Sequence, residues 1–197
     1  MYCEIMLVQH ALTQWNVEGK CQGHTDVPLN EEGWKMAYAL AKRLEHEQIS
    51  TVYTSDLKRA YQTALPFIIQ QDIPLYREKQ LREARWKNQQ YCNQYLTLPF
   101  SVDNEEEEDV CKRAKKVMRD IAQKHMGERI LVISHGGLIN RFMKYVHEKT
   151  GEIEPTYQKI RMAINYLKYE KDKWFFLQLN DVSHLEAKNA KKILDNG

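Results

Sequence analysis

The sequence lacks a strong excess of charge of either sign. It has 29 Lys and Arg residues against 27 Asp and Glu residues, a formal net charge of +2 over 197 residues. A chain so nearly balanced has no general electrostatic attraction to nucleic acid or to an anionic membrane. It also has no basic stripe with interleaved aromatic residues, so we expect no nucleic-acid partner. An anionic ligand would have to be held by a local cluster of side chains.

Long apolar runs and metal-binding cysteine patterns are missing as well. No segment approaches the roughly 20 apolar residues that span a bilayer, so we expect no membrane partner. The apolar segment Met1–His10 is short and lacks a basic flank and a cleavage site, which favours a first strand over a signal peptide. The four cysteines form no C-x-x-C pair and have no histidine at ligand spacing. We therefore expect reduced thiols, a cytoplasmic location and no metal.

The composition that is present is that of an ordinary globular protein. Hydrophobic residues make up 43% of the chain and charged residues 28%, which excludes a mainly disordered chain. The length suits one domain. We predict a single domain over residues 1–197, with a lid or substrate-binding segment at about 84–110, where hydrophobic periodicity is weakest.

Apolar runs and helical periodicities alternate along the chain. Strands are expected at 5–8, 51–54, 129–133, 161–169 and 173–179. Helices are expected to begin at Asn30, at Ser55 or Asp56, at about 105 and near Leu138, and Pro66 is expected to kink or end the second of them. This alternation predicts an α/β fold, a three-layer sandwich with a mainly parallel sheet, helices on both faces and an antiparallel end formed by the last hairpin.

Two histidines follow strands of the predicted sheet. His10 comes after the strand at 5–8, and His135 comes after the strand at 129–133. Ligands of open α/β sheets bind outside the carboxyl ends of the strands, so the two imidazoles are expected to face one crevice. Gly136 and Gly137 follow at a helix start, where free backbone N–H groups favour an anion. Each residue alone is consistent with a structural role, but the combination predicts an anion site.

Two charged residues complete the candidate site. Arg59 lies in the first turns of the helix that follows the strand at 51–54, and Glu83 lies at the end of an extended segment, 72–83. Taken alone, Arg59 is consistent with a surface ion pair and Glu83 with an exposed carboxylate.

These residues lie in motifs that resemble the histidine phosphatase superfamily, the phosphoglycerate mutase-like proteins. The motifs occur in order over almost the whole chain. They are Leu7-Val8-Gln9-His10-Ala11 with Thr13 and Trp15-Asn16, Gln22-Gly23-His24-Thr25, Tyr53-Thr54-Ser55-Asp56-Leu57-Lys58-Arg59, Leu81-Arg82-Glu83, Val132-Ile133-Ser134-His135-Gly136-Gly137 and Asn180-Asp181-Val182-Ser183-His184. The last of these resembles the bacterial phosphatase branch.

The resemblance implies a role for each matching residue. His10 would be the nucleophile that forms a phosphohistidine, and Glu83 the proton donor to the leaving group. Arg59 and His135 would stabilise charge on the phosphoryl group, with no metal or cofactor. Further substrate contacts are implied for Gln9, Asn16, Gln22, Gly23 and Gly136.

The sequence departs from the family pattern around the pocket. Gln9 stands where the family has Arg, and it lacks the guanidinium fork that neutralises a dianion. Ala11 replaces a Gly, which would cost roughly 1–2 kcal/mol if the position needed a positive φ. Segments 84–88 and 103–106 also differ from the pattern. Arg82, Arg85 or Lys87 could supply the missing charge.

Three functions are compatible with these observations. The first is a phosphomonoester phosphatase that acts on a small phosphorylated metabolite, with activity weakened by Gln9. The second is a catalytically degenerate protein that binds a phosphorylated metabolite. The third and least favoured is a phosphoglycerate mutase, because the chain has limited room between Glu83 and His135. The sequence leaves the choice between monomer and homodimer open.

Overall fold

The computed structural model describes residues 1–85, 105–151 and 160–185, which form a six-stranded sheet with helices on both faces. The strand order is β3-β2-β4-β1-β5-β6. The strands are β1 (Cys3–Gln9), β2 (Thr51–Thr54), β3 (Leu75–Arg77), β4 (Arg129–Ser134), β5 (Ile164–Glu170) and β6 (Lys173–Asp181). The helices are α1 (Gln14–Val17), α2 (Glu31–Leu44), α3 (Lys58–Gln71), η1 (Lys79–Leu81, a 3₁₀ turn), α4 (Glu107–Lys124) and α5 (Gly136–Thr150).

The sheet is parallel on one side of β1 and antiparallel on the other. β1 pairs parallel with β4, and β2 pairs parallel with β4 and β3. β5 runs antiparallel to β1, with Val8 opposite Ile164, and β6 runs antiparallel to β5. The turn between the last two strands has positive φ at Lys171 and Asp172, as tight hairpins require. The expected parallel sheet with an antiparallel end is confirmed.

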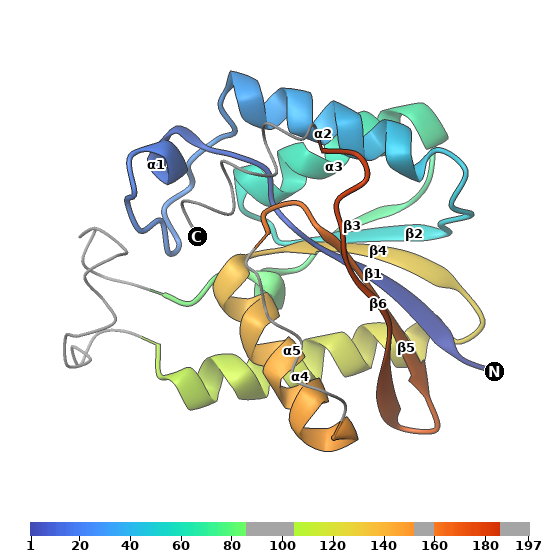
Figure 1. Cartoon of the computed structure of the whole chain (residues 1–197). Coiled ribbons are helices and arrows are strands. Elements are labelled where there is room, and N and C mark those ends of the chain that lie inside the picture. Colours follow the sequence, from blue (N-terminus) through green and yellow to red (C-terminus); the bar gives the residue numbers. More distant parts are fainter. Residues whose placement is uncertain (86–104, 152–159, 186–197) are drawn as a thin grey trace.

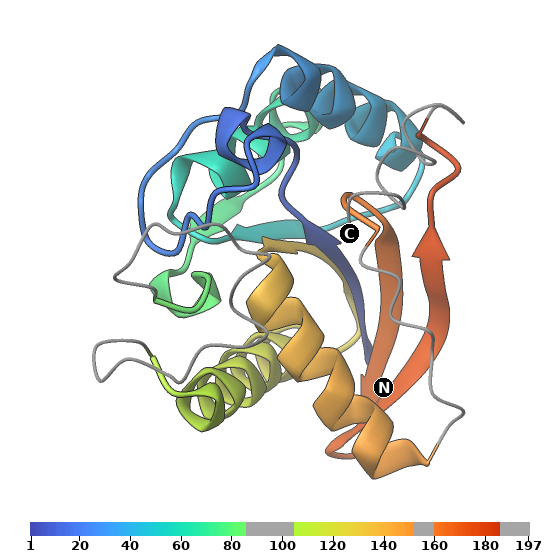
Figure 2. The ribbon, with the colours of Figure 1, turned by 60° about the vertical axis from the view of Figure 1, so that its left-hand side comes forward.

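Helices cover both faces of the sheet (Figures 1 and 2). α2 and α3 lie on one face, and α4 and α5 lie on the other. Each pair buries its apolar stripe against the face it covers, giving one core with Met36, Leu40 and Phe67 and a second with Met118 and Phe142. The predicted three-layer α/β sandwich is therefore confirmed.

The predicted start of α3 is wrong, whereas that of α2 is confirmed. Asn30 is the N-cap of α2, and its side-chain oxygen accepts from the Gly33 N–H at 2.8 Å. The N-cap of α3 is Leu57, which makes no side-chain capping bond. Of the two expectations for Pro66, a kink or an end, the end does not occur there, because α3 continues to Gln71. Its buried apolar residues hold the helix in place despite the lost N–H.

Some expectations fall on residues outside the described part of the chain. Most of the predicted lid segment lies there, at 86–104. Of the cysteines, Cys3 and Cys111 are free, as expected. Cys21 is disulfide-bonded, so the expectation of reduced thiols is wrong for Cys21. No helix among the described residues is both long and apolar enough to cross a membrane.

Candidate active site

His10 lies just beyond the carboxyl end of β1 and is almost completely buried, with 4% of its surface exposed. Its backbone N–H donates to the Ser134 carbonyl at 2.9 Å, which extends the pairing between β1 and β4. The ring atom Nδ1 lies 2.7 Å from the Ala11 carbonyl. Because a carbonyl can only accept, Nδ1 carries the proton. The lone pair of the neutral ring is therefore on Nε2.

His135 follows β4 as the N-cap of α5, and its side chain is completely buried. The Arg59 guanidinium donates from Nε to Nδ1 of His135 at 3.2 Å. The proton of the neutral ring is therefore on Nε2, a buried atom without a hydrogen-bond partner. The two rings are 5.1 Å apart between centroids. One ring thus offers a lone pair and its neighbour offers an N–H donor.

Both imidazoles are held in the neutral form. Burial lowers the pKa of His10 well below its usual value, and the positive charges of Arg59 and Arg161 lower it further. Burial likewise lowers the pKa of His135, with Arg59 as the next cause. A neutral imidazole at pH 7 is a competent nucleophile.

Arg59 is completely buried in the first turn of α3. Besides the bond to His135, its Nη1 donates to the Thr25 carbonyl at 2.8 Å and its Nη2 to the Gly23 carbonyl at 2.7 Å. Burial lowers the pKa of Arg59 to about 10, which leaves the group charged at neutral pH. The guanidinium is thus fixed in position, and two of its five N–H groups have no acceptor in the described part of the chain.

Glu83 lies at the N-terminus of α5, although it comes from the segment after η1. Its carboxylate accepts from the Gly137 N–H at 3.0 Å and from the Ala84 N–H at 2.9 Å. The positive end of the helix dipole favours a carboxylate there. A Cβ atom at Gly137 would collide with the Glu83 carboxylate. The glycine therefore leaves space for Glu83.

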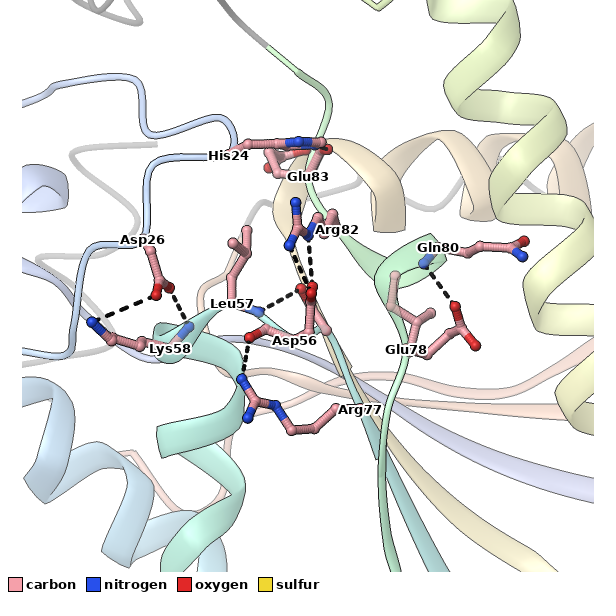
Figure 3. Close-up of polar contacts among 12 residues, drawn as sticks. His24, Asp26, Asp56, Leu57, Lys58, Arg77, Glu78, Gln80, Arg82 and Glu83 are labelled. Carbon is pink, nitrogen blue, oxygen red and sulfur yellow. Dashed lines mark hydrogen bonds and ion pairs between the residues drawn. The ribbon is translucent and has the colours of Figure 1, made fainter.

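Two residues that sequence analysis did not single out hold the backbone of Glu83. The His24 ring donates from Nε2 to the Glu83 carbonyl at 2.8 Å, and Figure 3 shows the two side by side. Arg113 on α4 donates to the carbonyls of Gln80 and Arg82 at 2.7 and 2.8 Å. No pattern in the sequence indicated these contacts, because they join residues far apart in the chain.

The other predicted contact residues differ in what they offer a ligand. The Gln9 amide packs against Gly136, with Nε2 3.0 Å from the place a Cβ would occupy. The Asn16 side-chain oxygen accepts from the backbone and hydroxyl of Thr13 in a capping box, which leaves its NH₂ group for a ligand. Gln22 has a buried side-chain oxygen without a partner. Gly23 uses its carbonyl to accept from Arg59.

Alanine at position 11 does not strain the backbone. Ala11 has no positive φ, so alanine fits the conformation there. Its N–H donates to the Thr63 hydroxyl at 3.0 Å, and that hydroxyl donates to the Arg59 carbonyl at 2.6 Å. These bonds tie the loop after β1 to α3. The loss of the family's glycine therefore costs nothing here.

Comparisons with known proteins identify the family to which this chain belongs. The profile of the histidine phosphatase superfamily (branch 1) matches residues 5–182. The chain belongs to this superfamily, which makes it a phosphatase-type protein of the phosphoglycerate mutase-like fold. Among the described residues, no group of three or more His, Cys, Asp or Glu side chains could hold a metal ion.

Several individual relatives match nearly the whole chain. Phosphoglycerate mutase-like protein 4 of Arabidopsis thaliana is 33% identical over 94% of this chain and 88% of its own. The metal-independent phosphoserine phosphatase of the same plant is 32% identical over 93% and 84%. The structure of Bacillus stearothermophilus YhfR superposes with a TM-score of 0.82 at 27% identity, covering 93% of this chain and all of YhfR.

Proposed function

We propose that the protein is a phosphomonoester phosphatase that acts on a small organic phosphate through a phosphohistidine on His10. The observation that carries this proposal is the pairing of two neutral imidazoles with a fixed guanidinium. His10 and His135 have ring centroids 5.1 Å apart, and Arg59 donates to His135. An imidazole lone pair beside an N–H donor and a cation suits attack on a phosphoryl group.

In the first half of the reaction, the His10 Nε2 lone pair attacks phosphorus and the bond to the leaving oxygen breaks. Glu83 gives its proton to that oxygen. Arg59 and the Nε2–H of His135 stabilise the charge on the non-bridging oxygens. The Nδ1–H of His10 keeps its bond to the Ala11 carbonyl, which stabilises the positive charge of the phosphorylated ring.

In the second half, a water oxygen attacks phosphorus and loses a proton to the Glu83 carboxylate. The bond between phosphorus and His10 breaks, which releases inorganic phosphate and restores the neutral ring. Each proton that moves in this sequence has a donor and an acceptor, with Glu83 as the protein group at both steps. We accordingly propose that the reaction needs no metal or cofactor.

Phosphoserine is the first substrate to test. A metal-independent phosphoserine phosphatase is among the relatives more than 30% identical to this chain. A small phosphorylated metabolite also fits a site that lies within one domain, as we propose for residues 1–197. The substrate and its specificity stay proposals, since segment 84–110, where we expect them to be set, lies mostly outside the described residues.

The test compares hydrolysis of an aryl phosphate and of phosphoserine by wild type and by His10→Ala. We expect turnover by wild type, no turnover by His10→Ala, and an acid-labile, base-stable phosphoryl group on wild type after a rapid quench. An exposed-histidine variant, His46→Gln, controls for general effects of substitution. Equal rates for wild type and His10→Ala would end the proposal.

A second candidate function is binding of a phosphorylated metabolite without turnover. Gln9 favours it, because a neutral amide cannot neutralise a dianion. In that case the wild type would bind inorganic phosphate but not hydrolyse esters, and Gln9→Arg would create activity. A coupled assay for phosphoglycerate interconversion tests the least favoured candidate, a mutase.

A further inference from the structure

The site needs a second cation, and position 9 does not supply it. Residue 9 ends β1 beside the candidate nucleophile, where its neutral amide packs on Gly136. A phosphomonoester dianion facing a single guanidinium would leave one negative charge unmatched. Loss of one charge-stabilising donor typically costs about 10²–10³ in rate. Another cation near His10 would remove this deficit.

Of three arginines near Glu83, two are paired with carboxylates and one is exposed. Arg82 makes a bidentate pair with Asp56, at 2.6 and 2.7 Å (Figure 3). Arg113 is paired with Glu105 at 2.8 Å. Arg85 is exposed, and Lys87 lies outside the described residues. The charges of Arg82 and Arg113 are therefore already matched by carboxylates.

Arg161 is placed differently, because β5 runs antiparallel to β1. Val8 pairs with Ile164, so the residues that precede β5 lie beside the residues that follow β1. The Nη1 atom of Arg161 donates to the His10 carbonyl at 3.3 Å. The guanidinium of Arg161 therefore lies at the same edge of the sheet as the imidazole of His10. His10 follows β1, whereas Arg161 precedes β5.

The surroundings of Arg161 lack a matching carboxylate. Within residues 1–85, 105–151 and 160–185, no acidic side chain forms an ion pair with it. Burial and the nearby positive charge of Arg59 lower the pKa of Arg161 to about 10, while Glu83 acts in the opposite sense. The group is still charged at neutral pH. Two guanidinium groups that repel each other at one rim are stabilised when an anion binds between them.

We propose that Arg161 is the second cation of the phosphoryl site and supplies the charge that Gln9 lacks. This inference rests on the proposed function, since it places Arg161 against the same phosphoryl oxygens as Arg59. One of its five N–H groups donates to the His10 carbonyl, and the others have no hydrogen-bond acceptor within residues 1–85, 105–151 and 160–185, so we expect them to bind the oxygens of the substrate. The bonds and protons that change in the proposed phosphatase reaction stay the same, and Arg161 adds only charge stabilisation.

The experiment measures the affinity for inorganic phosphate by calorimetry, together with kcat/KM for an aryl phosphate. Its variants are Arg161→Gln, Arg161→Lys, Gln9→Arg, the double variant Gln9→Arg/Arg161→Gln and the control Arg119→Gln, at an exposed arginine of α4. We expect Arg161→Gln to lower both quantities by roughly 10- to 100-fold, as for loss of a charged hydrogen bond. Arg161→Lys should retain part of both, and Arg119→Gln should resemble wild type.

The double variant is the most decisive test, because it removes the guanidinium at position 161 and places one at position 9. Gln9→Arg should restore most of the affinity and rate lost in Arg161→Gln. Restoration of binding also shows that the background is folded. If the Arg161→Gln protein does not fold, the phosphate affinity and kcat/KM of Arg161→Lys are compared with those of wild type instead. Lysine keeps the positive charge at position 161 but loses the forked donors of the guanidinium, so both quantities should fall.

Two results would overturn the inference. One is an Arg161→Gln protein that binds phosphate and turns over ester as wild type does. The other is an effect of Arg119→Gln as large as that of Arg161→Gln. Neither result affects the proposed function, which fails only if His10→Ala matches wild type in turnover. Phosphate affinity still decides the role of Arg161 in that case.

Discussion

At the scale of single residues, the site depends on fixed proton positions. Backbone carbonyls hold His10 and Arg59, and Arg59 in turn sets the proton on His135. The candidate residues were visible in the sequence because they lie in motifs. Their tautomers were not, because the partners that fix them are carbonyl groups, which every residue carries.

Arg59→Lys should damage both stability and turnover. A single ammonium cannot reach the Gly23 and Thr25 carbonyls and the His135 ring together. Because these donors are buried, we expect unfolding free energy to fall by about 2–4 kcal/mol and turnover by about 10²–10³. Urea unfolding and phosphatase kinetics measure the two effects. Arg77→Lys, at an exposed arginine, is the control, and an unchanged Arg59→Lys protein would contradict the prediction.

Gly137→Ala should lower activity without lowering stability. The added Cβ displaces the Glu83 carboxylate, whereas alanine in place of helical glycine stabilises α5 by up to about 1 kcal/mol. The loss should be large for an alkyl phosphate, whose leaving group needs a proton, and small for an activated aryl phosphate.

Gly136→Ala is the matched variant for that test. Its Cβ would meet the movable end of the Gln9 side chain, so we expect a smaller loss that does not depend on the leaving group. Equal losses on both substrates in Gly137→Ala would show that Glu83 is not the proton donor.

At the scale of helices and strands, the sequence predicted most of the elements but not the N-cap of every helix. Asn30 caps α2 as predicted. Asp56 does not cap α3, because its carboxylate is paired with Arg82. A sequence pattern ranks capping residues by local preference, but it cannot see a competing partner 26 residues away.

The contact between α2 and the loop after β1 gives a prediction on stability. Gly33 packs so closely on the Leu12 carbonyl that a Cβ there would collide with it. We expect Gly33→Ala to destabilise the protein by about 1–3 kcal/mol, although alanine is the better helix former. Lys35→Ala, on an exposed position of the same helix, should change stability by less than about 0.5 kcal/mol. Urea unfolding distinguishes them, and a stabilised Gly33→Ala would contradict the packing argument.

At the scale of the whole molecule, the two buried imidazoles make stability depend on pH. Their pKa values are lowered in the folded state, so the unfolded chain binds more protons below about pH 6.5. Stability should therefore fall as pH falls through that value, by up to about 1.4 kcal/mol per pH unit for each histidine.

Urea unfolding at pH 7.5, 6.5 and 5.5 measures this dependence. We expect His10→Gln to lose about half of the contribution, and His46→Gln, at an exposed position, to keep the wild-type slope. The buffer must be free of phosphate, since a bound anion stabilises the folded state. A wild-type stability that is flat over this range would contradict the prediction.

The sequence also predicted the layered architecture, because strands and helices alternate along it. It did not reveal Arg161, which belongs to no motif and is 151 residues from His10 in the chain. Only the antiparallel register of β5 with β1 brings the two together. The sequence pointed instead to Arg82, Arg85 or Lys87, which are close to Glu83 along the chain.

The reversed direction of β5 has a consequence for how such a site can change. Parallel strands contribute their last residues to the rim of the sheet, and those residues lie in the motifs that define the superfamily. An antiparallel neighbour contributes its first residues to the same rim, and these lie in a connection with no such pattern. A charge can therefore be lost on one side of β1 and regained on the other, while the core between them stays the same.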